Sequence, residues 1–138
     1  MVQQFRNLGI MKNIFFCLFV GLFALSACGQ NKFKDLEAPA FKEATANKSG
    51  IVILDVRTPA EWKEGVLEGA VLLNFYSDAF KEELTKIDPN KKVYIYCRSG
   101  GRSAKAAQIL SENGYSEVYN LLGGIGAWNE AKYKTVAP

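Results

Sequence analysis

Residues 93–113 read VYIYCRSGGRSAKAAQILSEN, which predicts a strand, a tight turn and a helix in direct succession. The first residues are apolar, β-branched or aromatic, as in a strand that is buried on both faces. A glycine-rich turn at 98–102 follows Cys97, and residues 103–113 have the alanine and aliphatic spacing of a packed helix that stops at Gly114. A buried strand that leads into a helix is typical of an α/β fold.

The same alternation continues on both sides of this stretch. Further strands are predicted at residues 51–56, 71–75 and 118–122, with a short edge strand at 33–36. Helices are predicted at residues 38–46, 77–87, 103–113 and 126–132, with one more helix start at Thr58-Pro59. Strands that alternate with helices imply a mainly parallel sheet covered on both faces. Sites in such sheets form beyond the C-terminal ends of the strands.

Composition narrows the class of function. The 138 residues have room for one domain, and 49% are hydrophobic, which is enough for a packed core. The formal net charge is +3 and the basic residues are spread along the chain, which argues against a nucleic-acid surface. The chain has no histidine, so histidine-based catalysis and histidine-ligated metal sites are excluded. The three cysteines match no zinc or redox spacing, and we expect neither a metal nor a cofactor.

The N-terminus has the features of an export signal. Lys12 precedes an apolar run at residues 14–25, which has the length of a signal peptide core and is shorter than the about 20 residues of a membrane-spanning helix. The run ends in Leu25-Ser26-Ala27-Cys28, which resembles a bacterial lipobox. That resemblance implies cleavage before Cys28 and lipidation of its sulfur. An uncleaved apolar anchor or a buried helix is the alternative interpretation.

These features predict three segments. Residues 1–27 are a lipoprotein-type signal peptide with a possible start at Met11, residues 28–32 are a lipidated N-terminus and linker, and residues 33–138 are the folded domain. The expected location is the bacterial cell envelope, on the periplasmic side or the outer membrane, with the lipid as the membrane contact. Because Cys17 falls in the signal peptide, Cys97 is the one free thiol expected in the mature chain.

The turn after Cys97 has the physical features that activate a thiol. Gly100 and Gly101 allow the backbone to curl so that successive N–H groups face inward and bind an anion. The helix that follows adds positive partial charge, and Arg98 and Arg102 add permanent charges. These conditions lower a thiol pKa, so the same loop can activate a nucleophile and bind an anionic substrate. The alternative is a buried strand-end cysteine before an ordinary glycine turn, with Arg98 as a solvated surface residue.

Three segments together resemble the rhodanese superfamily. They are CRSGGRS at 97–103, DVRTPAEW at 55–62 followed by GVLEGA at 65–70, and GGIGAW at 123–128. They occur in the family's order, and the resemblance covers about residues 33–132. It implies a three-layer α/β domain with a mainly parallel five-stranded sheet and helices on both faces. It also implies a sulfurtransferase that takes a sulfane sulfur from a small anion such as thiosulfate and passes it to a thiol or cyanide.

The resemblance also implies roles for individual residues. Cys97 would carry the sulfur as a persulfide, and Arg102 would close the loop around it. We expect Asp55 to support the site by pairing with a loop arginine, and Ser103 to support it at the helix start. Arg57 would contact the substrate anion or brace the loop. The complete set of expected substrate-binding residues is Arg98, Ser99, Gly100, Gly101, Arg102 and Arg57.

Two other functions stay open for a chain of this kind. Phosphatases and arsenate reductases of the same fold use a Cys-x5-Arg loop, whereas Cys97 to Arg102 is Cys-x4-Arg, a tighter loop that suits a terminal sulfur better than a tetrahedral oxyanion. Some rhodanese-like domains are non-catalytic binding modules, although these often lack the cysteine. One departure from the family is Val66, where relatives often have histidine, and we expect that position to serve packing.

Overall fold

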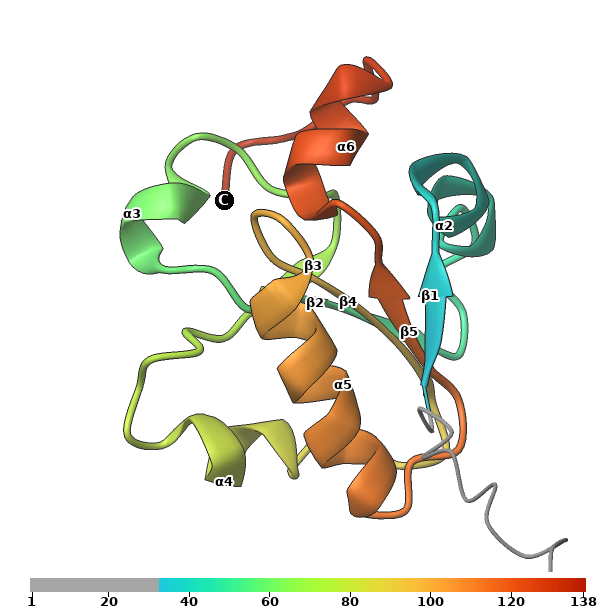
Figure 1. Ribbon diagram of the computed structural model, residues 1–138, viewed down its shortest axis with the longest axis vertical. Coiled ribbons are helices and arrows are strands. Elements are labelled where there is room, and N and C mark those ends of the chain that lie inside the picture. The colour runs from blue at the N-terminus through green and yellow to red at the C-terminus, as the bar shows by residue number, and fades with distance from the viewer. Residues whose placement is uncertain (1–32) are drawn as a thin grey trace, which may run out of the picture. The chain divides into compact units, whose positions relative to one another are not determined.

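Residues 33–138 are described by the computed structural model of the chain and belong to one folded unit (Figure 1). The predicted signal peptide, the lipid site at Cys28, the linker at 28–32 and the possible start at Met11 lie outside the described residues. Within residues 33–138, no helix combines the length and apolar character needed to cross a membrane.

Five parallel strands form one sheet in the order β1-β5-β4-β2-β3. The strands are β1 (Lys34–Leu36), β2 (Ile51–Asp55), β3 (Ala70–Leu72), β4 (Lys92–Tyr96) and β5 (Val118–Leu121). The predicted edge strand is β1, which lies at one edge of the sheet. This arrangement confirms the predicted fold class, and it places β4 in the middle of the sheet.

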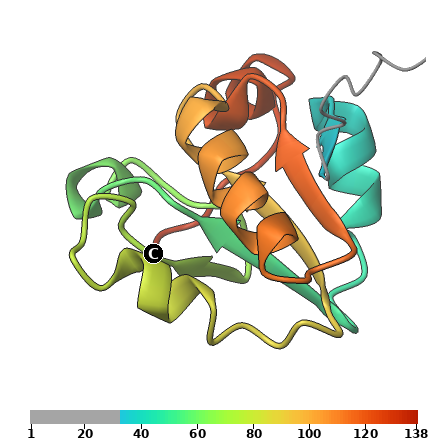
Figure 2. The same ribbon diagram turned by 60° about the horizontal axis from the view of Figure 1, so that its bottom comes forward.

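Helices cover both faces of this sheet, as Figures 1 and 2 show. They are α2 (Ala38–Ala44), α3 (Pro59–Trp62), α4 (Phe80–Leu84), α5 (Gly101–Glu112) and α6 (Gly124–Glu130). Side chains of α4 and α5 pack into the core on one face, and those of α2 and α6 pack into the core on the other. The short helix α3 follows β2 directly.

The alternation of side chains along β4 explains why its sequence is apolar throughout. Val93, Ile95 and Cys97 belong to the core beneath α5, whereas Tyr94 and Tyr96 belong to the core beneath α2 and α6. Successive residues of a strand point to opposite faces, so a strand covered on both faces needs apolar residues at every position. Cys97 therefore lies on the α5 side of the sheet.

Several helix boundaries differ from the prediction: α2 ends two residues early, and α6 begins and ends two residues before the predicted 126–132. Helix α4 is shorter than the predicted 77–87, because residues before it form a turn in which the N–H of Ala79 donates to the Ser77 hydroxyl at 3.3 Å. Helix α5 begins at Gly101, two positions before the predicted start. Gly100 precedes it with a φ of +101°, a left-handed conformation that glycine adopts without steric cost, so the glycine pair belongs partly to the helix.

Candidate active site

Cys97 directly follows β4, and Arg57 follows the neighbouring β2 two residues after its end. Both therefore lie at the C-terminal edge of the parallel sheet, where the sequence predicts the site. The Cys97 side chain is buried, with 1% of its surface exposed. It is a free cysteine, at the base of the loop that leads into α5.

Two donors contact the sulfur of Cys97 directly. The backbone N–H of Gly100 lies 3.1 Å from Sγ, and the hydroxyl of Ser103 lies 3.3 Å from it. The left-handed Gly100 turns the chain so that its N–H faces back toward the cysteine three residues earlier. At Gly100 this geometry matches the inward-facing N–H that the sequence predicts for the loop.

These contacts shift the pKa of the thiol. Burial raises the pKa of Cys97, because a thiolate loses its hydration. The Ser103 hydroxyl and the backbone N–H groups of Ser103, Gly100 and Ser99 lower the pKa by more, so it lies below the ordinary value for a cysteine. The hydrogen-bond donors of the loop thus favour thiolate without a histidine.

Ser103 is fully buried and links the sulfur to the loop backbone. Its Oγ lies 3.3 Å from Sγ and 3.1 Å from the carbonyl oxygen of Gly100. A hydroxyl has one proton to donate and can also accept. It can donate to Gly100 when the thiol is protonated and turn its proton to the sulfur when the thiolate forms. Ser103 therefore supports both protonation states of Cys97.

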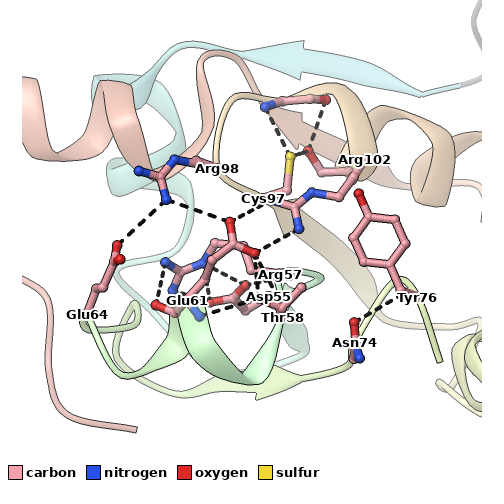
Figure 3. Close-up of polar contacts among 12 residues, drawn as sticks. Asp55, Arg57, Thr58, Glu61, Glu64, Asn74, Tyr76, Cys97, Arg98 and Arg102 are labelled. Carbon is pink, nitrogen blue, oxygen red and sulfur yellow. Dashed lines mark hydrogen bonds and ion pairs between the residues drawn. The ribbon is translucent and has the colours of Figure 1, made fainter.

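A second cluster ties the loop to α3. Arg102 donates to Glu61 through both terminal nitrogens, from Nη1 to Oε2 at 2.9 Å and from Nη2 to Oε1 at 2.8 Å (Figure 3). The same carboxylate accepts from the N–H and hydroxyl of Thr58 at 2.9 and 2.8 Å, which completes the cap of α3. The bond from Arg102 is the main cause that lowers the pKa of Glu61 to about 2, and Glu61 in turn raises the pKa of Arg102.

The rim of the site carries the exposed side chains of Tyr76, Arg98 and Glu64 beside the partly buried Arg102. The Arg102 guanidinium lies over the ring of Tyr76 at 5.7 Å, and Tyr76 is 67% exposed. Arg98 points toward Glu61 and Glu64, with distances of 3.9 and 3.8 Å from its Nη1 to their carboxylates (Figure 3). Arg98 is mostly exposed, so it forms part of the entrance instead of touching the sulfur.

Asp55 and Arg57 form a buried ion pair, and this changes two expectations. Asp55 pairs with Arg57 at 2.7 Å and not with a loop arginine. Arg57 also donates to the carbonyls of Glu61 and Gly65, at 3.1 and 2.7 Å. Both side chains of the pair are at most 1% exposed. Arg57 thus uses its donors on Asp55, on Glu61 within α3 and on Gly65 after it, which favours the bracing role over contact with a substrate.

The structure thus brings together Cys97, Ser103 and the loop backbone, and it connects Arg102 to a partner that the sequence did not indicate. Glu61 stood out only as a carboxylate in the first turn of a helix, and its contact with Arg102 joins residues 41 positions apart. Ser99 and Gly101 are exposed, and their expected substrate contacts stay predictions. Within residues 33–138, no three acidic, cysteine or histidine side chains gather as a metal site.

Comparisons with known proteins agree with this geometry. Residues 37–131 match the model of the rhodanese-like domain family. A sulfurtransferase of Allochromatium vinosum is 34% identical over 104 residues, which cover 75% of this chain and 95% of the relative. The thiosulfate sulfurtransferase GlpE of Shewanella oneidensis is 33% identical over 101 residues, which cover 73% of this chain and 97% of the relative.

Solved structures give the same result. A rhodanese-related protein from Thermoplasma volcanium superposes with a TM-score of 0.66 at 28% identity, over 76% of this chain and 99% of that one. A rhodanese-like domain protein from Staphylococcus aureus has a TM-score of 0.61 at 32% identity, over 69% of this chain and 90% of that one. Sequence and fold therefore match over nearly the full length of these proteins.

Proposed function

The chain belongs to the rhodanese-like domain family, and on that premise we propose that it is a sulfurtransferase that carries a sulfane sulfur on Cys97. The observation that carries this proposal is the buried sulfur with the Gly100 N–H and the Ser103 hydroxyl at 3.1 and 3.3 Å. A persulfide anion needs such donors as much as a thiolate does. The similarity to relatives named as sulfurtransferases supports the same activity.

In the first step, the Cys97 thiolate attacks the sulfane sulfur of a donor such as thiosulfate. A new S–S bond forms on Cys97 while the S–S bond of thiosulfate breaks, and its electron pair leaves with sulfite. The product is a persulfide on Cys97 whose terminal sulfur carries the negative charge. Arg102 is held at the loop by Glu61, so its guanidinium is in place to contact the anionic donor.

In the second step, the thiolate of an acceptor, or cyanide, attacks the terminal sulfur of the persulfide. The S–S bond to Cys97 breaks, the sulfur leaves on the acceptor, and Cys97 is again a thiolate. The donors that lower the pKa of Cys97 make it a good leaving group in this step. The same loop contacts therefore serve both halves of the cycle.

The proposal is tested by steady-state transfer of sulfur from thiosulfate to cyanide, measured as thiocyanate. Wild-type protein should turn over, and Cys97→Ser should reduce the rate to background. Ser116→Ala is the matched control, because that serine lies outside the site on an exposed turn. A wild-type protein that transfers sulfur from neither thiosulfate nor another sulfane donor would contradict the proposal.

A phosphatase assay separates this function from the main alternative of the same fold. The Cys-x4-Arg spacing predicts no Cys97-dependent hydrolysis of an aryl phosphate. Turnover that is lost in Cys97→Ser, in a protein without sulfur transfer, would assign the chain to phosphoryl chemistry instead.

We also propose that the chain is a lipoprotein of the bacterial cell envelope, anchored through Cys28. The lipobox-like LSAC at residues 25–28 supports this location. Metabolic labelling with a palmitate analogue in a bacterial host should mark the wild-type protein and not Cys28→Ser. Labelling that persists in Cys28→Ser, or a mature chain that retains residues 1–27, would contradict it.

A further inference from the structure

The loop after Cys97 is held from outside by the first turn of α6. The N–H of Ile125 donates to the carbonyl of Cys97 at 2.9 Å, and the N–H of Gly126 donates to the carbonyl of Arg98 at 3.2 Å. The first N–H groups of a helix have no partner within that helix. These two bonds therefore satisfy donors of α6 and acceptors of the loop at the same time.

The direction of these carbonyls sets the direction of the neighbouring N–H groups. A peptide group is planar, and in residues 33–138 none is cis, so each N–H points away from the C=O of its own unit. With the carbonyls of Cys97 and Arg98 directed at α6, the N–H groups of Arg98 and Ser99 are directed into the loop. The carbonyl of Gly100 accepts from the N–H of Ala104 at 3.0 Å, in the first turn of α5. At Cys97 and Arg98 the carbonyls thus face α6 and the N–H groups that follow them face into the loop.

Gly124 permits this contact. It has a φ of +58°, in the left-handed region that favours glycine. A Cβ at this position would lie 2.5 Å from the carbonyl carbon and the carbonyl oxygen of Arg98, and closer still to the carbonyl oxygen of Cys97. The obstacle would be backbone, which cannot rotate away as a long side chain can. Any other residue at position 124 would push the loop and α6 apart.

We propose that α6 holds the Cys97 loop with its N–H groups toward the sulfur, and that Gly124 is the positioning residue that allows this contact. Gly124 touches neither the sulfur nor a substrate, so it acts through the loop backbone. The inference deepens the proposed function. It rests on that function in one respect, namely that Cys97 is the reacting thiol. It assigns a role in the site to Gly124, 27 residues beyond the cysteine.

The test is the pH dependence of Cys97 alkylation by iodoacetamide in the full mature chain, which reports thiolate without needing a sulfur donor. In Gly124→Ala, the midpoint of the rate profile should move to higher pH, and the rate near pH 7 should fall about tenfold, as for the loss of a hydrogen bond to a charged group. Gly114→Ala is the matched control. The φ of Gly114 is +90°, and no atom lies within 4 Å of the Cβ that alanine would add. The substitution therefore strains the backbone without touching a neighbour, and the pH profile of Cys97 alkylation should stay unchanged.

A second variant keeps the test decisive if Gly124→Ala does not fold. An amide-to-ester replacement at residue 125 removes the N–H that donates to Cys97 and adds no bulk, so the midpoint should rise by a smaller amount in the same direction. An unchanged midpoint in a folded Gly124→Ala or in the ester variant would overturn the inference, as would an equal shift in Gly114→Ala. A protein that shows these shifts but transfers no sulfur would refute the proposed function and leave the role of Gly124 standing.

Discussion

Two arginine–carboxylate pairs lie near Cys97, and they differ in burial and in reach. Asp55 and Arg57 are 0% and 1% exposed, and they are two residues apart in the chain. Glu61 and Arg102 are 16% and 18% exposed, and they join α3 to the loop across 41 positions. In the first pair, the remaining donors of Arg57 bind the carbonyls of Glu61 and Gly65, so the pair braces the backbone around α3. The second is partly exposed and joins two separate segments, so its arginine can respond to a substrate.

The difference predicts that loss of the buried pair affects stability most. Arg57→Ala leaves the Asp55 carboxylate buried without its cation and frees the carbonyls of Glu61 and Gly65, so the free energy of unfolding should fall by about 3–5 kcal/mol. Urea unfolding measures this loss. Arg98→Ala, at an exposed arginine, should change stability by less than about 0.5 kcal/mol. Equal losses in the two variants would show that the buried pair has no special structural role.

The second pair should affect activity more than stability. Arg102→Ala removes the charge that Glu61 holds at the loop, so sulfur transfer from thiosulfate should fall about tenfold, while the unfolding free energy changes by about 1 kcal/mol. Arg98→Ala should reduce transfer by less than about twofold, because Arg98 points toward Glu61 and Glu64 at the rim. Steady-state rates of the two variants at a fixed thiosulfate concentration test this difference. An equal loss of rate in Arg102→Ala and Arg98→Ala would contradict the loop-closing role of Arg102.

Glu61 predicts a smaller effect that depends on pH. Its folded-state pKa of about 2 lies below the ordinary value of 4.5, so the carboxylate stabilises the fold above about pH 4.5 and this contribution is lost as pH falls toward 2. Glu61→Gln should therefore cost about 1 kcal/mol at pH 6 and less at pH 2.5. Unfolding curves at the two pH values test this. A cost that is the same at both would show that the charge of Glu61 contributes nothing.

Much of the fold was predictable because its signals are local. The buried strand at 93–97 and the capping pattern at Thr58-Pro59 each depend on residues adjacent in sequence, and both are confirmed. The early start of α5 was not predicted, because the pattern shows that a glycine pair bends the chain but not which glycine turns left-handed. The core position of Val66 fits the expectation that it serves packing, since it is 4% exposed.

The site was predictable only where its parts are close in sequence. Cys97, Gly100 and Ser103 lie within seven residues, so their convergence on one sulfur could be inferred from the loop. The contact between Arg102 and Glu61 could not be inferred from the loop, because the two residues meet only where the neighbouring strands β2 and β4 end. The partner expected for Asp55 was a loop arginine, and the nearer Arg57 takes that place because it is already in the same buried turn.

The most direct test of the central claim is the intact mass of the mature protein after incubation with thiosulfate. The wild-type chain should gain one sulfur atom, lose it again on addition of cyanide, and gain nothing when Cys97 is replaced by serine. The Arg57→Ala variant, if folded, should still load sulfur, because Arg57 braces the fold and does not touch the thiol. No mass gain in the wild-type protein with any sulfane donor, or a gain that persists in Cys97→Ser, would contradict the account.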